Sequence, residues 1–136
     1  MSRYFSDNKT LILYYEGSYG PTLRIETTTQ KWLKYFKCNI LKLAKEDILE
    51  IDLASLIDIK LDNVISVVLT KTKSKKIHNE IRQVSEGHLM WSQDTESLIT
   101  IAGLIDGLLV NDKPGHQYLT PEGDEILVVL GYKELR

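Results

Sequence analysis

Hydrophobic residues recur at helical spacing in two stretches of this chain, while much of the remaining sequence alternates as a strand does. The first stretch begins after Thr28 or Thr29, either of which can cap a helix, and the second begins at Asp94. The segments around them are short and rich in β-branched residues, so they predict strands. Because these strands do not alternate regularly with helices, the order favours an α+β fold over a doubly wound sheet. We predict one mainly antiparallel sheet with two principal helices in a single layer on it.

Two pairs of neighbouring segments predict hairpins. Residues 11–15 and 22–28 flank a turn that contains two glycines and a proline, which favours a hairpin with a loop longer than two residues. Residues 64–72 and 77–84 flank a lysine-rich turn and predict a second hairpin, with a helix as the alternative for the later segment.

The acidic stretch that follows the first helix leaves its structure open. Residues 47–54 fit either a helix or a strand, whereas alternation after Ser55 favours a strand. A turn is expected over residues 120–124, where proline and glycine stand at turn positions. Further strands are expected over residues 86–91 and 125–132, the last being apolar enough to lie inside the sheet, with a short extended piece over 116–119.

The composition is that of one ordinary domain over residues 1–136. The 17 basic and 19 acidic residues give a net charge of −2, so nucleic acid is not an expected partner. The charges are nevertheless grouped, with lysines over 31–45 and 71–76 and acids over 47–62, and such patches suit association with a protein. The single cysteine, Cys38, excludes an intrachain disulfide, and we expect it to be a small buried side chain of the first helix.

The start of the chain lacks the apolar stretch of a signal peptide, and no apolar segment approaches the roughly 20 residues that span a bilayer. These patterns predict a cytoplasmic protein without a membrane partner.

Motifs for catalysis, cofactor binding and metal binding are not recognisable. No strand is followed by a phosphate-binding glycine loop. His78, His88 and His116 lack the spacing that would place two metal ligands on one element, so each is expected to be structural, with His78 on an exposed strand. We therefore expect no catalytic residues, no metal site and no cofactor.

The most distinctive local sequence follows the second helix, where Pro114 and Gly115 precede His116, Gln117 and Tyr118. The two rigid turn residues hold the following side chains in defined directions, which suits a polar anchor or an acid–base group. The favoured interpretation is nevertheless a packed turn whose histidine and tyrosine satisfy backbone groups. The candidate binding residues are His88, Trp91, His116, Gln117 and Tyr118.

The last third of the chain has a recognisable order. A segment that ends in Trp91 is followed by the apolar helix 98–109, the sequence 114–119 and a closing strand over 126–132. This order resembles the carboxyl-terminal part of small α+β immunity proteins of bacterial toxin systems. The resemblance implies a protein that binds a partner tightly and is not an enzyme.

Three hypotheses follow for the function. The leading one is a small cytoplasmic protein-binding module of the immunity type, with a charged rim and a few aromatic anchors. The second is a small-ligand-binding protein or enzyme with a pocket around His116 and Tyr118, to which His88 contributes. The third is a homodimer formed through an exposed strand or helix face.

Overall fold

The computed structural model describes residues 9–72, 80–120 and 125–134, and in these residues the chain forms two α-helices, nine strands and one 3₁₀ turn. The helices are α1 (Gln30–Ala44) and α2 (Thr95–Leu109), and the 3₁₀ turn is η1 (Leu53–Ser55). The strands are β1 (Thr10–Gly17), β2 (Gly20–Thr27), β3 (Glu50–Asp52), β4 (Ile59–Asp62), β5 (Ser66–Lys71), β6 (Glu80–Ser85), β7 (His88–Gln93), β8 (Gly115–Tyr118) and β9 (Leu127–Tyr132).

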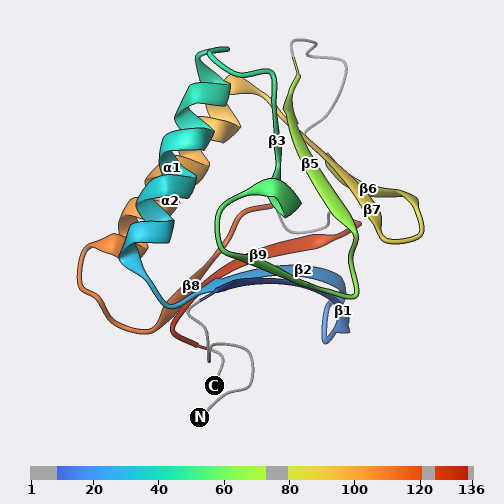
Figure 1. Ribbon diagram of the computed structural model, residues 1–136, viewed down its shortest axis with the longest axis horizontal. Helices are drawn as coiled ribbons and strands as arrows, with labels where there is room; N and C mark the ends of the chain where they lie inside the picture. Colours follow the sequence, from blue (N-terminus) through green and yellow to red (C-terminus); the bar gives the residue numbers. More distant parts are fainter. Residues whose placement is uncertain (1–8, 73–79, 121–124, 135–136) are drawn as a thin grey trace.

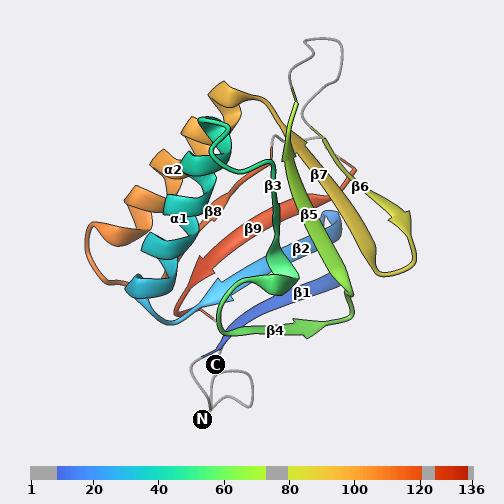
Figure 2. The same cartoon turned by 45° about the horizontal axis from the view of Figure 1, so that its top comes forward.

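The strands form two sheets, a five-stranded one in the order β4-β1-β2-β9-β8 and a four-stranded one in the order β3-β5-β7-β6 (Figures 1 and 2). Both are mixed. In the larger sheet β1–β4 and β2–β9 are parallel while β1–β2 and β8–β9 are antiparallel. In the smaller sheet β5–β7 is parallel, and β3–β5 and β6–β7 are antiparallel. The predicted α+β class is confirmed, whereas the prediction of one mainly antiparallel sheet is wrong.

The hairpin predicted from β5 and β6 does not form, because β7 lies between these two strands. β7 pairs with β5 in parallel and with β6 in antiparallel orientation. The physical reason is burial: Leu89 and Trp91 of β7 are almost fully enclosed, whereas Ile81 is the one buried residue of β6. An apolar strand takes the inner position and a mostly exposed strand takes the edge. The first predicted hairpin, β1–β2, is confirmed. Its loop consists of Ser18 and Tyr19, so the expectation of a loop longer than two residues is wrong.

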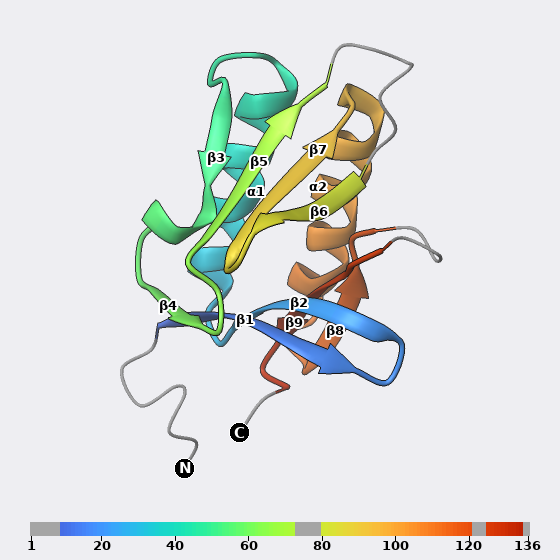
Figure 3. The ribbon, with the colours of Figure 1, turned by 90° about the vertical axis from the view of Figure 1, so that its right-hand side faces the viewer.

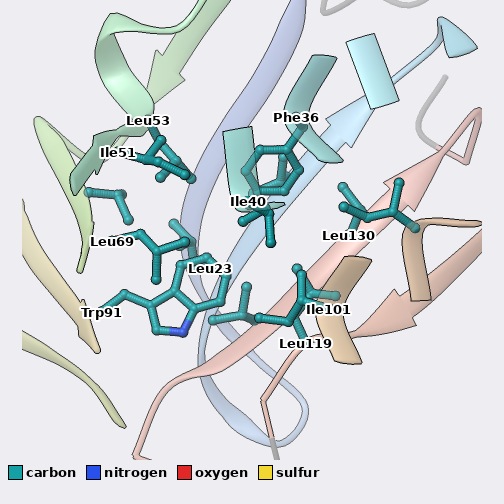
Figure 4. Close-up of a cluster of buried hydrophobic side chains, with 14 of the residues drawn as sticks. Leu23, Phe36, Ile40, Ile51, Leu53, Leu69, Trp91, Ile101, Leu119 and Leu130 are labelled. Carbon is teal, nitrogen blue, oxygen red and sulfur yellow. The ribbon is translucent and has the colours of Figure 1, made fainter. Parts of the chain in front are cut away.

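The two helices lie side by side along one flank of the molecule, and the two sheets meet at an angle beside them (Figures 1 and 3). Both sheets and both helices contribute to one cluster of buried hydrophobic side chains. In Figure 4, Leu69 and Trp91 come from the smaller sheet, Leu23 and Leu130 from the larger one. The core therefore fills the space enclosed by the helices and the inner faces of the two sheets.

The helix starts follow from their capping residues. The hydroxyl of Thr29 accepts a hydrogen bond from the Trp32 N–H at 3.2 Å, and the Asp94 carboxylate accepts one from the Ser97 N–H at 2.8 Å. Both caps were expected from the sequence. Glu96 lies in the first turn of α2, where the helix dipole favours an anion.

Two local predictions need correction or completion. Cys38 is exposed, not buried, and lies on the lysine-bearing face of α1 with Lys34 and Lys42 one turn away on either side. The stretch after α1 is the strand β3 followed by η1, and the Asp52 carboxylate caps η1 by accepting a hydrogen bond from the Ala54 N–H. Most of the lysine-rich turn, His78 and most of the turn over 120–124 lie outside the described residues.

Candidate functional site

The five-stranded sheet has an apolar inner face and an outer face on which polar and apolar side chains are mixed. In β2, Leu23 and Ile25 point into the core, while Arg24 points to the opposite side with its neighbours at alternate positions. The pairing registers place residues of four strands on this outer face: Tyr15, Thr22, Arg24, Glu26, His116, Tyr118, Leu127, Val129 and Gly131.

A hollow of about 380 Å³ lies on this outer face at the end of the sheet that carries the β1–β2 turn. His116 and Tyr118 of β8 contribute to its lining from one side, and Tyr15 and Tyr19 contribute from the hairpin. The rings of His116 and Tyr118 meet edge to face, with centroids 5.3 Å apart and planes at 80°. Tyr19 is 86% exposed and Tyr118 is 50% exposed, so both can be reached by a partner.

A network of charged side chains forms another part of the site. Nε of Arg24 donates to Oε1 of Glu26 at 3.0 Å, and its Nη2 donates to Oε1 of Glu134 at 2.8 Å. The main-chain N–H of Glu134 donates to Oε2 of Glu26 at 2.8 Å. Nδ1 of His116 lies 2.9 Å from Oε1 and 3.0 Å from Oε2 of Glu134. The network therefore joins β2, β8 and the residues that follow β9.

The electrostatics of this network favour the charged forms of Arg24 and Glu134. Burial alone would lower the pKa of Arg24, but the Glu26 carboxylate and the hydrogen bonds to both glutamates outweigh burial and raise it. Burial alone would likewise raise the pKa of Glu134, but hydrogen bonds with His116 and Arg24 lower it below its ordinary value. Both groups are thus held charged by their contacts.

Gly131 of β9 makes room for this network. A Cβ at this position would overlap Oε1 of Glu26 and lie 2.7 Å from Nη2 of Arg24. The Glu26 side chain is fully buried and the Arg24 side chain is 15% exposed, so neither can move aside without loss of contacts. A residue with a side chain at position 131 would therefore exclude the ion pair.

The segment that leads into β8 is tied to the core. The ring of Tyr132 is buried, and its hydroxyl donates a hydrogen bond to the Asp112 carboxylate. Nζ of Lys133 also lies 3.0 Å from Oδ1 of Asp112. Burial and the hydrogen bond to Asp112 raise the pKa of Tyr132, while hydrogen bonds from Tyr132 and Lys133 lower the pKa of Asp112. These contacts fix the loop between α2 and β8, and hence the position of His116.

The structure brings together two of the five candidate residues, His116 and Tyr118. His116 is exposed and contacts the Glu134 side chain, so the interpretation that it satisfies a backbone group in a packed turn is wrong. Gln117 points to the opposite side of β8, where its Nε2 lies 2.9 Å from the position that a Cβ of Gly107 in α2 would take. Gln117 therefore contributes to the packing of the helix and not to the outer face.

The other two candidates lie in the smaller sheet. Nδ1 of His88 is 2.7 Å from Oγ of Ser66, its cross-strand neighbour in β5. Trp91 is fully buried in the core, and among the described residues its Nε1 has no hydrogen-bond partner. Neither residue reaches the hollow beside His116, so the two candidate regions are separate.

Sequence reasoning missed Arg24, Glu26 and Glu134. Arg24 and Glu26 alternate with the buried residues Leu23 and Ile25, so the sequence was sufficient to place Arg24 and Glu26 on one face of a strand. The sequence contains no signal that this face lies beside the end of β9, since β2 and β9 pair in parallel from opposite ends of the chain.

No family model, no curated protein and no solved structure matches this chain. Within the part of the chain that the structure describes, no group of three His, Cys, Asp or Glu side chains could hold a metal ion. No helix of that part is both long enough and apolar enough to cross a membrane.

Proposed function

We propose that this protein is a small cytoplasmic protein-binding module whose contact surface is the outer face around the hollow. The observation that carries the proposal is the convergence of Tyr19, Tyr118 and His116 beside the Arg24–Glu134 ion pair. Interfaces concentrate their binding energy in a few tyrosine, tryptophan and arginine side chains surrounded by polar groups. The outer face has this composition.

The charged part of the proposed contact surface is held in place by contacts within the chain itself. His116 is fixed by Glu134, and Glu134 is fixed by Arg24 and by its own main-chain bond to Glu26. An ordered site loses little conformational entropy when it binds, which favours affinity. The tyrosines then act as anchors, because a ring offers a large contact area with few rotatable bonds.

We further propose that the binding is of the immunity type, in which the module occludes a toxin. The support is the resemblance of the carboxyl-terminal third to immunity proteins. That third contains α2, β8 and β9, and the last two strands carry four of the residues that line the hollow: His116, Tyr118, Leu127 and Val129.

A second candidate is a small-ligand site in the same place. Its support is the size of the hollow, since about 380 Å³ lies within the range of roughly 300–1,000 Å³ that is common for ligand pockets. Much of its polar lining is already paired, as Arg24 and Glu134 bind each other. A small molecule that raised the unfolding temperature of the wild type but not of Tyr118→Ala would favour this candidate over a protein partner.

The proposal is tested by capture of a partner from the native host. Immobilised wild-type protein should retain a discrete partner, and the double variant Tyr19→Ala/Tyr118→Ala should lose it. Val84→Ala is the matched control, because Val84 is 51% exposed on β6 of the other sheet. Retention of the partner by the double variant, or capture of no protein, would contradict the proposal.

The immunity part has its own test. The captured protein, expressed without this chain, should arrest bacterial growth, and co-expression of the chain should restore growth. A harmless captured protein would contradict the immunity proposal and leave the protein-binding proposal in place.

A further inference from the structure

Among the strands that the structure describes, β8 lies at the edge of the five-stranded sheet and pairs with β9 alone. The main-chain N–H of Leu119 donates to the Val128 carbonyl at 2.8 Å. In an antiparallel pair the main-chain groups of successive residues point alternately toward the neighbour and away from it. The main-chain groups of Gln117, two residues before Leu119, therefore form hydrogen bonds with β9. The N–H and C=O groups of His116 and Tyr118 point to the open edge.

The other side of β9 confirms this assignment. The Lys133 N–H donates to the Thr27 carbonyl at 2.9 Å, so the main-chain N–H and C=O groups of the odd-numbered residues of β9 point toward β2. The main-chain groups of Leu130, the residue opposite Gln117, then point toward β8.

The edge at β8 differs from the other sheet edges in the described residues. These edges are β3, β4 and β6, and each bears charged side chains that hinder pairing with another chain: Glu50 and Asp52, Lys60 and Asp62, and Glu80 and Arg82. β6 is also interrupted by a bulge between Gln83 and Ser85. β8 reads Gly-His-Gln-Tyr, without lysine, arginine or a carboxylate, and without a bulge in its pairing with β9.

We propose that two copies of this chain pair through β8 in antiparallel orientation. A twofold axis at Gln117 places His116 of one copy opposite Tyr118 of the other. The twofold axis generates two such His116–Tyr118 pairs between the copies. In each pair the outward main-chain groups meet and exchange two hydrogen bonds. A second copy is the occupant that this edge fits, because the pattern of outward groups is its own complement under the twofold axis.

The pairing also extends the outer face. Directly opposite residues of an antiparallel pair have side chains on the same side of the sheet. Tyr118 of the second copy therefore lies beside His116 of the first, and the two hollows become neighbours on one ten-stranded sheet. The contact of histidine and tyrosine rings within one chain shows that these side chains pack well. This inference does not depend on the identity of any other partner.

Because β8 is only four residues long, we expect a weak dimer whose population depends on concentration. The mass of the purified protein in solution should rise from one chain toward two as the concentration increases. Hydrogen exchange of single amides then locates the contact. The amides of His116 and Tyr118 should slow by about tenfold once about nine-tenths of the chains are paired. The Gln117 amide, bonded to β9, should be protected at every concentration and is the internal control.

Proline substitution gives a second test. Tyr118→Pro removes an N–H that points away from β9, so the fold should persist while the mass stays at one chain. Tyr118→Ala keeps this N–H and loses only the ring that packs beside His116. It is the matched control and should still dimerise, more weakly than the wild type, whereas the proline variant should not. If the proline variant does not fold, the exchange rates of the wild type decide the question.

Two results would overturn the proposal. One is a mass of a single chain at every concentration. The other is a dimer in which the His116 and Tyr118 amides exchange as fast as in the dilute protein, because the contact would then lie elsewhere.

Discussion

Nη2 of Arg24 lies 2.8 Å from Oε1 of Glu134, although 110 residues separate the two along the chain. The same guanidinium contacts the fully buried carboxylate of Glu26. Arg24 therefore joins the second strand of the protein to the residues that follow the last one, on the face that carries the candidate site.

Replacement of Arg24 by leucine should destabilise the protein strongly. The substitution leaves the Glu26 carboxylate buried without its guanidinium partner, and loss of one partner of a buried ion pair costs about 3–5 kcal/mol. Urea unfolding of wild type and Arg24→Leu gives the difference in the free energy of unfolding.

Arg82→Leu is the control for this prediction. The Arg82 side chain is 61% exposed and lies 3.8 Å from a half-exposed Glu80, so its loss should change the free energy of unfolding by less than about 0.5 kcal/mol. Equal effects of the two substitutions would contradict the role assigned to Arg24.

Gly131→Ala should destabilise the protein by about 1–3 kcal/mol, because the added methyl group overlaps the buried Glu26 carboxylate. Gly103→Ala in α2 is the matched control. A Cβ there meets no atom within 4 Å, and alanine is the better helix former, so a gain of up to about 1 kcal/mol is expected. Thermal unfolding of both variants should show a lower unfolding temperature for Gly131→Ala and a higher one for Gly103→Ala. Two changes in the same direction would count against the packing described at Gly131.

The lowered pKa of Glu134 predicts a dependence of stability on acid pH. A carboxyl group whose pKa is lower in the folded state contributes its full stabilisation above its unfolded pKa. That stabilisation disappears as the pH falls through the lower folded pKa. Between about pH 5 and pH 3 the wild type should therefore lose stability more steeply than Glu134→Gln, as measured by denaturant unfolding at several pH values. Parallel curves for the two proteins would show that Glu134 has no such contact.

Trp91 and Tyr118 were both predicted from the sequence as binding residues. Their substitution by alanine should lower the free energy of unfolding by very different amounts. Trp91→Ala removes a fully buried side chain and should cost about 3–5 kcal/mol in the free energy of unfolding. Tyr118→Ala removes a half-exposed ring and should cost less than about 1 kcal/mol. Similar losses in urea unfolding would mean that one of the two residues has been placed wrongly.

Cys38 should react with a maleimide in the native protein about as fast as in the unfolded one, because it is exposed on α1. If Cys38 reacted only in the unfolded protein, it would be buried, as the sequence predicted, and not exposed.

Local patterns in the sequence identified the elements better than their arrangement. The caps Thr29 and Asp94 depend on side-chain bonds within a few residues, and both were recognisable. The hairpin β1–β2 was also predicted, since a short turn joins strands that pair with each other. The pairing of β5 with β7 was not predicted, because periodicity specifies which face of a strand is buried and does not specify its neighbour.

The same distinction holds at the site. His116 and Tyr118 share a side of the sheet because residues two apart on a strand do so, and the sequence was sufficient to group them. Arg24 and Glu134 meet through a parallel pairing of β2 with β9, which local sequence does not encode. Trp91 was placed among the binding residues by its position in the chain, although burial in the core accounts for it.

The most direct test of the proposed function is site-specific photo-crosslinking in cells of the native host. A photoreactive residue at Tyr118 or at Tyr19 should form a covalent adduct with a second protein, while the same residue at Val84, on the other sheet, should not. An adduct of two copies of this chain is distinguished by its mass and by its peptides. A second protein captured from position 84 but not from positions 118 and 19 would contradict the assignment of the outer face as the binding surface.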